Sequence, residues 1–361
     1  MFTASTHNSR SFGLDLMRSL AILFVLLSHF VHKWNFLGFL GVEIFFALSG
    51  FLIGGILWRT FSESNGWSGA QVLNFWQRRW WRTLPNYYLF LIVNLIFHPL
   101  YYHTLPSFSY LVKFLWFGTN LLTHRSDFFN VSWSLAVEEW LYLLFPLILF
   151  CLSRFIPAKH SAYVFSILTI ILGCTLIRQY LLTTPAAHHI RGITLARLDA
   201  IGYGIALSYA LTILRLDRAE RLLLFCFGII LMAAPFWLSY LSEQSLATYL
   251  PTHPFLLTST PLGAALLLPL TLQIPRPNLR ILGMAINRIS LWSYSIYLCH
   301  VPIMMLAYKF VSNTTLLGAA LPKLVGIVVT IVLSGLLYHY FEHPLTKRRP
   351  AELTQKPMLV S

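Results

Sequence analysis

Long apolar runs separated by short polar stretches make up most of this chain. Each run approaches the roughly 20 residues that an α-helix needs to cross the hydrocarbon core of a bilayer. The pattern therefore predicts an all-α integral membrane protein, a bundle of about ten transmembrane helices. The expected spans are residues 13–31, 37–58, 84–103, 133–153, 161–182, 193–214, 222–241, 255–272, 290–310 and 320–341.

One apolar stretch, residues 109–122, is too short for a span and contains Lys113. We expect a re-entrant or interfacial helix there. A full eleventh span would reverse the orientation of every later segment. It would also place the basic cluster at residues 215–221 outside the cell.

The positive charges support this count and give an orientation. With the N-terminus in the cytoplasm, the basic clusters at residues 78–82, 215–221 and 347–349 fall on the cytoplasmic side, whereas the loop 242–254 has no Lys or Arg. Because cytoplasmic loops carry an excess of Lys and Arg, the pattern predicts that both termini are cytoplasmic. Most of the net charge of +14 then reflects topology and not nucleic-acid binding.

The composition agrees with a membrane protein, since only 11% of the residues are charged, against about 25% in a soluble chain. We expect a multi-pass protein of the inner (plasma) membrane, with a single transmembrane domain over residues 1–345 and a short basic cytoplasmic tail over 346–361. The four cysteines lie inside apolar runs, and no His, Cys and Asp cluster has ligand spacing. We therefore expect neither a disulfide framework nor a metal site.

Ionisable residues inside spans cost about 2.5–3.5 kcal/mol each and so need a reason. The first span carries Arg18 near its cytoplasmic end and His29 near its outer end. Their spacing of eleven residues puts them on one helix face, about 16 Å apart along the axis. A thioester donor has an anionic head and a reactive tail, so Arg18 could hold the head while His29 acts as a base. Alternatively, Arg18 snorkels to headgroups and His29 caps the helix.

Charged residues also lie near the start of the second and third expected spans. Glu43 lies at roughly the depth of His29 and either contacts substrate, orients the imidazole or is solvated. Arg79 and Arg82 lie in the expected loop before the third span, and their spacing of three residues would give them one direction if this stretch were helical. Two guanidiniums there can bind phosphates bidentately, or serve only as a positive anchor.

Adjacent carboxylates inside a span are the sharpest signal. Glu138 and Glu139 point about 100° apart on a helix, so at least one faces a polar interior. We expect one of them to take part in catalysis, and the sequence leaves open which one. A structural pair with a buried Arg is the alternative.

Hydroxyl-bearing and aromatic side chains surround these carboxylates in two segments. The residues Ser132, Trp133 and Ser134 precede the acidic pair. Tyr297 and His300 share one face of a later span, and that face either lines a cavity or forms interhelical hydrogen bonds. We expect all five side chains to contact substrate.

Together these segments resemble the acyltransferase-3 family of membrane-bound acyltransferases, the surface polysaccharide O-acetylase type, over residues 11–345. Five stretches carry the resemblance in the family's order. They are Arg18 followed by His29, the Gly-x-acid-x-Phe-Phe-x-x-Ser-Gly-Phe-Leu-Ile run at 41–53, Arg79-x-x-Arg82 before Leu-Pro, Ser132-Trp133-Ser134-Leu135 through Glu138-Glu139, and Ser293-Tyr294-Ser295-Ile296-Tyr297 through His300-Val301-Pro302.

The resemblance implies ten spans and an O-acyltransferase that moves an acyl group, usually acetyl, from cytoplasmic acyl-CoA to an extracytoplasmic hydroxyl. The acceptor would belong to a sugar, a polysaccharide or a lipid-linked sugar. The essential residues of the family match Arg18, His29, the pair Arg79 and Arg82, and the acidic pair Glu138 and Glu139. No permanently bound cofactor is expected, since acyl-CoA is a substrate. Glu43 departs from the Asp that the family commonly has.

Two other functions compete with this one. The first is an acyl-delivery membrane protein that hands the group to a separate extracytoplasmic transferase, which would then be encoded separately. The second is a secondary transporter or flippase, because intramembrane Arg, His and Glu also mark transport paths. A repeat architecture would favour transport, and the sequence has no convincing repeat.

Overall fold

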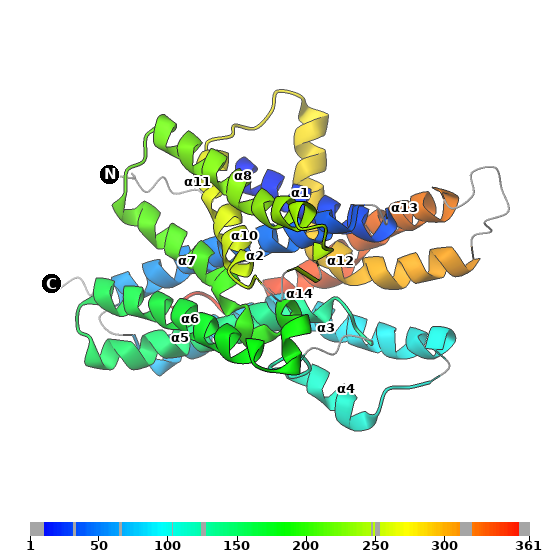
Figure 1. The fold of residues 1–361 in the computed structure, drawn as a ribbon, viewed down its shortest axis with the longest axis horizontal. Helices are drawn as coiled ribbons and strands as arrows, with labels where there is room; N and C mark the ends of the chain where they lie inside the picture. The colour runs from blue at the N-terminus through cyan, green and yellow to red at the C-terminus, as the bar shows by residue number, and fades with distance from the viewer. Residues whose placement is uncertain are drawn as a thin grey trace.

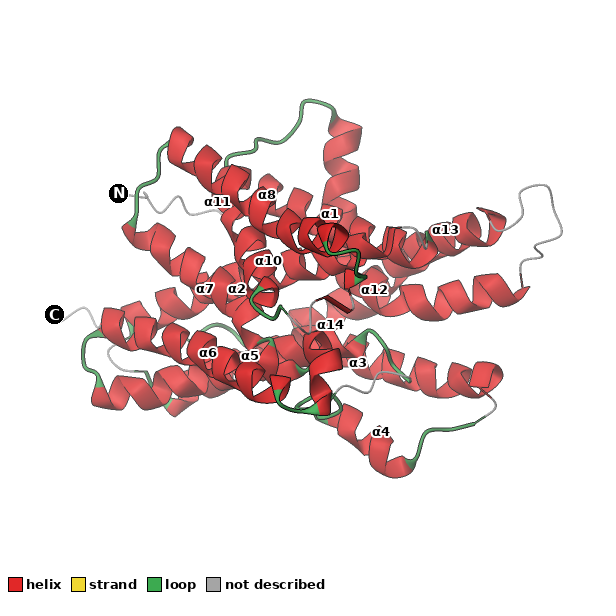
Figure 2. Cartoon of the chain, viewed as in Figure 1, coloured by secondary structure: helices red, strands yellow, loops and turns green. Residues whose placement is uncertain are grey.

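The computed structural model of the protein describes residues 11–31, 34–64, 67–102, 104–123, 128–246, 248–249, 253–310 and 320–353. These residues form helices joined by loops, without a strand (Figures 1 and 2). The helices are α1 (Phe12–Phe30), α2 (Asn35–Glu63), α3 (Gly69–Tyr102), α4 (Phe108–Leu115), α5 (Ser132–Phe155), α6 (Lys159–Leu182), η2 (Pro185–Gly192), η3 (Thr194–Ala196), α7 (Leu198–Ile213), α8 (Arg218–Leu241), α10 (Leu256–Leu266), α11 (Leu268–Thr271), α12 (Arg280–Phe310), α13 (Ala320–Leu337), η4 (Tyr338–Glu342) and α14 (His343–Lys347).

The predicted all-helical membrane fold is confirmed. Among the described residues, seven helical stretches are long and apolar enough to cross a bilayer: α1, α2, α5, α6, α8, α12 and residues Ala320–Lys347. Of the other predicted spans, the one within α3 is helical but does not reach this standard. The 16-residue α7 and the apolar stretch Leu256–Thr271 are shorter. The count of ten and the cytoplasmic termini stay predictions.

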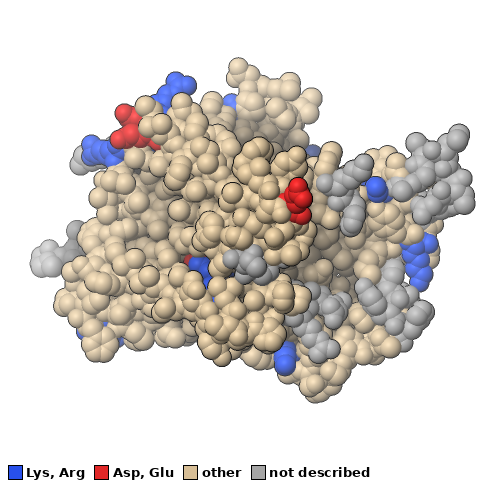
Figure 3. Space-filling model, viewed as in Figure 1, with Lys and Arg blue, Asp and Glu red and all other residues tan. Residues whose placement is uncertain are grey.

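The surface has the character of a lipid-facing bundle. Large apolar side chains are widely exposed, among them Ile96 on α3, Leu176 on α6 and Ile230 on α8. On the face drawn in Figure 3, charged side chains are few, and a broad uncharged surface lies between them. In lipid, only a helix can satisfy its own backbone hydrogen bonds while presenting such side chains.

Small residues bring the central helices into close contact. A Cβ at Gly50 of α2 would lie 2.0 Å from the carbonyl oxygen of Ile201 in α7, and one at Gly204 would lie 2.3 Å from that of Ala47. Glycine is therefore required on both sides of this crossing, as is common where membrane helices pack backbone to backbone. The crossing holds α2, which carries several site residues, at the centre of the bundle (Figure 1).

The expected loop before the third span is not a loop. Helix α3 begins at Gly69 and runs for 34 residues through Pro85. Arg79 and Arg82 therefore lie on a helix, where their spacing of three residues gives them a common side. The expectation of a loop was wrong because a polar, Arg- and Trp-rich stretch can extend a spanning helix beyond the bilayer.

The apolar stretch 109–122 forms only the eight-residue helix α4. Tyr87 and Tyr88 of α3 donate hydrogen bonds to the carbonyl oxygens of Phe114 and Leu115 at its C-terminal end, at 2.9 and 2.8 Å. Eight residues rise about 12 Å, which is too short to cross a membrane. The expectation that no full span lies here is confirmed.

The described part of the tail packs against the bundle. Arg78 donates a hydrogen bond to the carbonyl oxygen of Pro350 at 2.8 Å, and Glu352 pairs with Arg59 at 3.0 Å and with Arg78 at 3.4 Å. Partial burial works against the charge on Glu352, but the two guanidiniums outweigh it and lower the pKa of this carboxyl. Residues 354–361 of the predicted tail lie outside the described residues.

Cysteine labelling tests the predicted orientation. In a chain without the exposed Cys151 and Cys226, Gln244→Cys in the loop 242–254 should react with an impermeant maleimide in intact cells. Ala219→Cys in the basic cluster at 215–221 should react only after the membrane is opened. Both positions are exposed. The opposite pattern would contradict cytoplasmic termini.

Candidate active site

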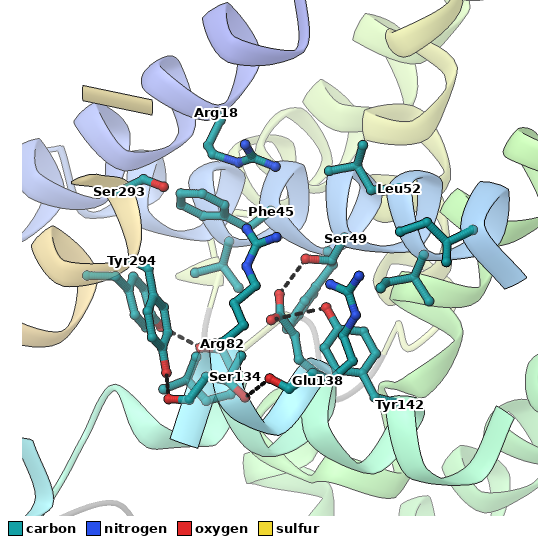
Figure 4. A pocket seen from close by; sticks show the side chains of 18 residues that line it. Arg18, Phe45, Ser49, Leu52, Arg82, Ser134, Glu138, Tyr142, Ser293 and Tyr294 are labelled. Carbon is teal, nitrogen blue, oxygen red and sulfur yellow. Dashed lines mark hydrogen bonds between the residues drawn. The ribbon is translucent and has the colours of Figure 1, made fainter. Parts of the chain in front are cut away.

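An inner cavity of about 210 Å³ brings the predicted cationic residues together. Arg18 enters it from α1, and Arg79 and Arg82 enter it from α3 (Figure 4). Tyr294 of α12 lines the same cavity. The helix that the sequence did not foresee at 69–83 is what aims both α3 guanidiniums in one direction, while Arg78 points to the tail. The three cations form a site suited to phosphate groups.

Glu138 is the member of the acidic pair that faces this cavity. It accepts a hydrogen bond from Ser49 of α2 at 2.7 Å and one from Tyr142, one turn further along α5, at 3.4 Å (Figure 4). Glu139 is buried and lines a separate groove of about 280 Å³ together with Trp80 and Trp140. Of the two carboxylates, Glu138 is therefore the one that lines the cavity of the three arginines, and Glu139 lines the separate groove.

A second, outer cavity of about 250 Å³ contains His29. Val42 and Tyr297 line both this cavity and the inner one. The Tyr297 hydroxyl lies 2.5 Å from the Ser134 hydroxyl, and it also donates to the carbonyl oxygen of Val131 at 3.3 Å. These contacts fix the tyrosine in place, and Val42 and Tyr297 form a wall that the two cavities share.

His300 lies behind His29, with the ring centroids 4.8 Å apart. Its Nδ1 is 2.8 Å from the carbonyl oxygen of Tyr297. A carbonyl only accepts, so Nδ1 carries the proton and Nε2 keeps its lone pair. Among the described residues this buried Nε2 has no hydrogen-bond partner. His300 therefore offers a free acceptor beside His29.

Beyond His29 a vestibule of about 560 Å³ continues the outer cavity. The two share five lining residues, which include Trp133 and Arg191. Trp133 thus fits the predicted contact with substrate. Ser132 is buried at the start of α5 and lines none of these cavities, so a direct contact with substrate is not supported for it.

Glu43 requires a similar correction. It is completely buried and forms an ion pair with Arg197, at 2.5 Å between its Oε1 and the guanidinium Nη2. Arg197 in turn donates to the carbonyl oxygen of Leu257 at 2.7 Å, which ties α2 to α10. Glu43 lines none of these cavities, and this geometry gives it a structural role instead of a contact with substrate.

Sequence reasoning missed several members of the site. Ser49 and Tyr142 hold Glu138, Arg197 neutralises Glu43, and Arg191 lines the outer cavities. The only signal for Arg197 was indirect, because a buried Glu needs a cationic partner. Ser49 lies in the Ser-Gly-Phe run that carries part of the family resemblance, but the run alone does not show that its hydroxyl meets Glu138.

Comparison with known proteins agrees with this geometry. The family model described as "Acyltransferase domain" matches residues 11–339. The chain is 26% identical to the putative peptidoglycan O-acetyltransferase YrhL of Bacillus subtilis, over 96% of this chain and 56% of that protein. It is 27% identical to the peptidoglycan O-acetyltransferase OatA of Listeria monocytogenes, over 95% of this chain and 57% of that protein.

A third relative matches over a shorter region. The O-acetyltransferase OatA of Staphylococcus aureus is 33% identical over 47% of this chain and 30% of that protein. The chain thus spans little more than half the length of the curated relatives that it matches most fully. No solved structure matches it. The family model covers nearly the whole described region, and the chain therefore belongs to the acyltransferase-3 family of membrane proteins.

Proposed function

We propose that this protein is an O-acetyltransferase that moves an acetyl group from acyl-CoA in the inner cavity to a carbohydrate hydroxyl in the outer one. The observation that carries the proposal is the shared wall of Val42 and Tyr297 between a cavity with three arginines and a cavity with a histidine. A donor and an acceptor that enter from opposite sides would meet at this wall. The names of the relatives support acetyl transfer to a carbohydrate.

The donor end follows from charge. The phosphates of acyl-CoA would bind Arg79 and Arg82, with Arg18 in the same cavity. Guanidinium–phosphate hydrogen bonds are charge-assisted and geometrically matched. The thin pantetheine arm would then extend between α2 and α5 and bring the thioester to the wall. Glu138, held by Ser49 and Tyr142, adds one negative charge to the same cavity.

The chemical step needs one base. In this proposal His29 takes the proton of the acceptor hydroxyl as its oxygen attacks the thioester carbonyl. The carbon–sulfur bond then breaks, the ester forms, and the thiolate of CoA takes up the proton. The ring of His300 lies 4.8 Å from that of His29, and its Nε2, unpartnered among the described residues, would stabilise the imidazolium that forms when His29 takes up the proton. A covalent acyl-enzyme is the alternative route.

The decisive experiment uses purified protein in lipid nanodiscs, labelled acetyl-CoA and a carbohydrate acceptor. Formation of an O-acetyl ester from these components alone supports the proposal. If product appears only after a second, extracytoplasmic transferase is added, the chain is an acyl-delivery protein instead. If acetyl-CoA is neither bound nor consumed, the proposal fails.

Removing the two α3 arginines tests the donor site. Arg79→Ala and Arg82→Ala should each weaken acetyl-CoA binding by about 1.5–3 kcal/mol, because each loses a hydrogen bond between charged groups. Binding of labelled acetyl-CoA to nanodisc-embedded variants measures this. Arg78→Ala is the matched control, since its guanidinium contacts the tail and does not line the cavity. If the double variant binds acetyl-CoA as tightly as the wild type, these arginines serve only to orient the chain in the membrane.

A further inference from the structure

Arg191 gives the outer cavities an unusual charge. It lies at the end of η2 and lines both the cavity around His29 and the wider vestibule. Among the described residues that line these two spaces, it is the only Lys or Arg, and none is Asp or Glu. Any molecule that enters from this side therefore passes a single fixed cation before it reaches His29.

The charge of Arg191 is not neutralised by a contact within the described chain. The nearest carboxylate, Glu43, already pairs with Arg197 at 2.5 Å. Arg191 forms no ion pair with any described carboxylate, and its buried Nε has no hydrogen-bond partner among the described residues. The single carboxylate of Glu43 therefore balances only one of the two guanidiniums of Arg191 and Arg197, which leaves one positive charge at the cavity wall. A partly buried charge of this kind is stabilised by a bound anion.

Two aromatic rings hold the guanidinium. Its central carbon lies 4.5 Å from the ring centre of Phe39 and 5.3 Å from that of Trp133. Contacts of this kind use the flat faces of the group and leave its N–H edge free to donate. The planar fork is therefore pre-oriented for a carboxylate or another flat oxyanion.

The remaining lining fits a sugar ring. Phe36 and Phe236 add aromatic surface to the vestibule, and Asn35, Asn130 and Ser245 add groups that bind hydroxyls. The volume of about 560 Å³ falls within the range of small-molecule sites. Apolar and aromatic walls with a few polar groups are typical of such sites.

We propose that Arg191 binds a carboxylate on the acceptor, so that the preferred acceptor is an acidic sugar. The inference deepens the proposed function and rests on it. The charge count favours a singly charged carboxylate over a diphosphate, because one unneutralised cation balances one negative charge. Arg191 thereby selects the acceptor and sets its hydroxyl near His29, without touching the reacting atoms.

The test compares two acceptors that differ only in this group, methyl glucuronide and methyl glucoside. Wild-type protein in nanodiscs should bind and acetylate the glucuronide with a preference on the order of 10- to 100-fold, through a lower KM. Arg191→Gln should reduce this ratio to about one, and Arg191→Lys should keep part of it as a point charge. Lys113→Gln removes an exposed positive charge that lines none of these cavities, and should leave the ratio unchanged.

Several outcomes overturn the inference. Equal use or equal binding of the two glycosides, or binding of neither, would do so. A ratio that survives in Arg191→Gln would do so as well, and so would a loss of the ratio in Lys113→Gln, which would indicate long-range attraction only. A preference for glucose-1-phosphate over the glucuronide would replace the carboxylate with a phosphate. Acetylation of both glycosides at one rate would leave the proposed function standing, whereas binding of the glucuronide without transfer would count against that function alone.

Discussion

His29→Gln is expected to lower acetyl transfer by about 10²- to 10⁴-fold, the usual contribution of general base catalysis. Glutamine keeps the polarity and much of the size of histidine but cannot accept a proton at neutral pH. His29 is open to the outer cavity and lies on the side away from the three arginines. Binding of acetyl-CoA should therefore change little, and rapid-quench transfer assays with separate donor-binding measurements distinguish the two effects.

A second histidine provides the control for this experiment. His160 lines neither the inner nor the outer cavity and makes a hydrogen bond with Tyr209 at 2.8 Å. His160→Gln should keep transfer near the wild-type rate. Near-normal turnover in His29→Gln would mean that the imidazole has only a structural role, and the role of base would then pass to Glu138.

Breaking the buried ion pair between Glu43 and Arg197 should produce the largest loss of stability. Both side chains are completely buried, so removing one leaves an uncompensated charge away from water. Such changes cost about 3–5 kcal/mol. Glu43→Gln and Arg197→Gln should each lower the free energy of unfolding by this amount in mixed-micelle denaturation. The double variant should lose much less than the sum, because neither charge is then left alone.

An exposed pair offers the matched comparison. Arg59 and Glu352 approach to 3.0 Å, but the Arg59 side chain is 54% exposed. Arg59→Gln should lower the free energy of unfolding by no more than about 1 kcal/mol, since water screens such pairs.

The double variant of Glu43 and Arg197 decides whether the buried pair acts as a unit. If its loss of stability equals the sum of the two single losses, the residues act independently, which would contradict the ion pair described above.

The hydrophobic pattern predicted the helices well because lipid imposes one backbone solution on every apolar run. The pattern failed at residues 69–83. This polar part of α3 extends beyond the apolar stretch, so no run of apolar residues marks it as helical. The family motifs singled out Arg18, Arg79, Arg82 and Glu138 as site residues, and in the structure these four side chains line one cavity.

Other features of the site depend on packing that no single helix encodes. The choice between Glu138 and Glu139 is set by the rotation of α5 against α2 and α3, which a helical wheel leaves free. The pairing of Glu43 with Arg197 joins positions 154 residues apart, and a single sequence contains no signal that links them. Arg191 lies outside the predicted motifs altogether, in the short helix η2 between α6 and α7.

The wall of Val42 and Tyr297 also matters for the membrane as an electrical insulator. If the two cavities merged, they would form a water-filled path across the membrane. Ions would leak through such a path, and the ion gradients of the cell would dissipate. A bulky, hydrogen-bonded side chain between the two cavities, such as Tyr297, would block hydrated ions in the way that constrictions close channels. The same residue that brings donor and acceptor within reach of each other thus keeps the bilayer sealed. A substitution that widens this wall to admit larger acyl groups would therefore also make the membrane more permeable to ions.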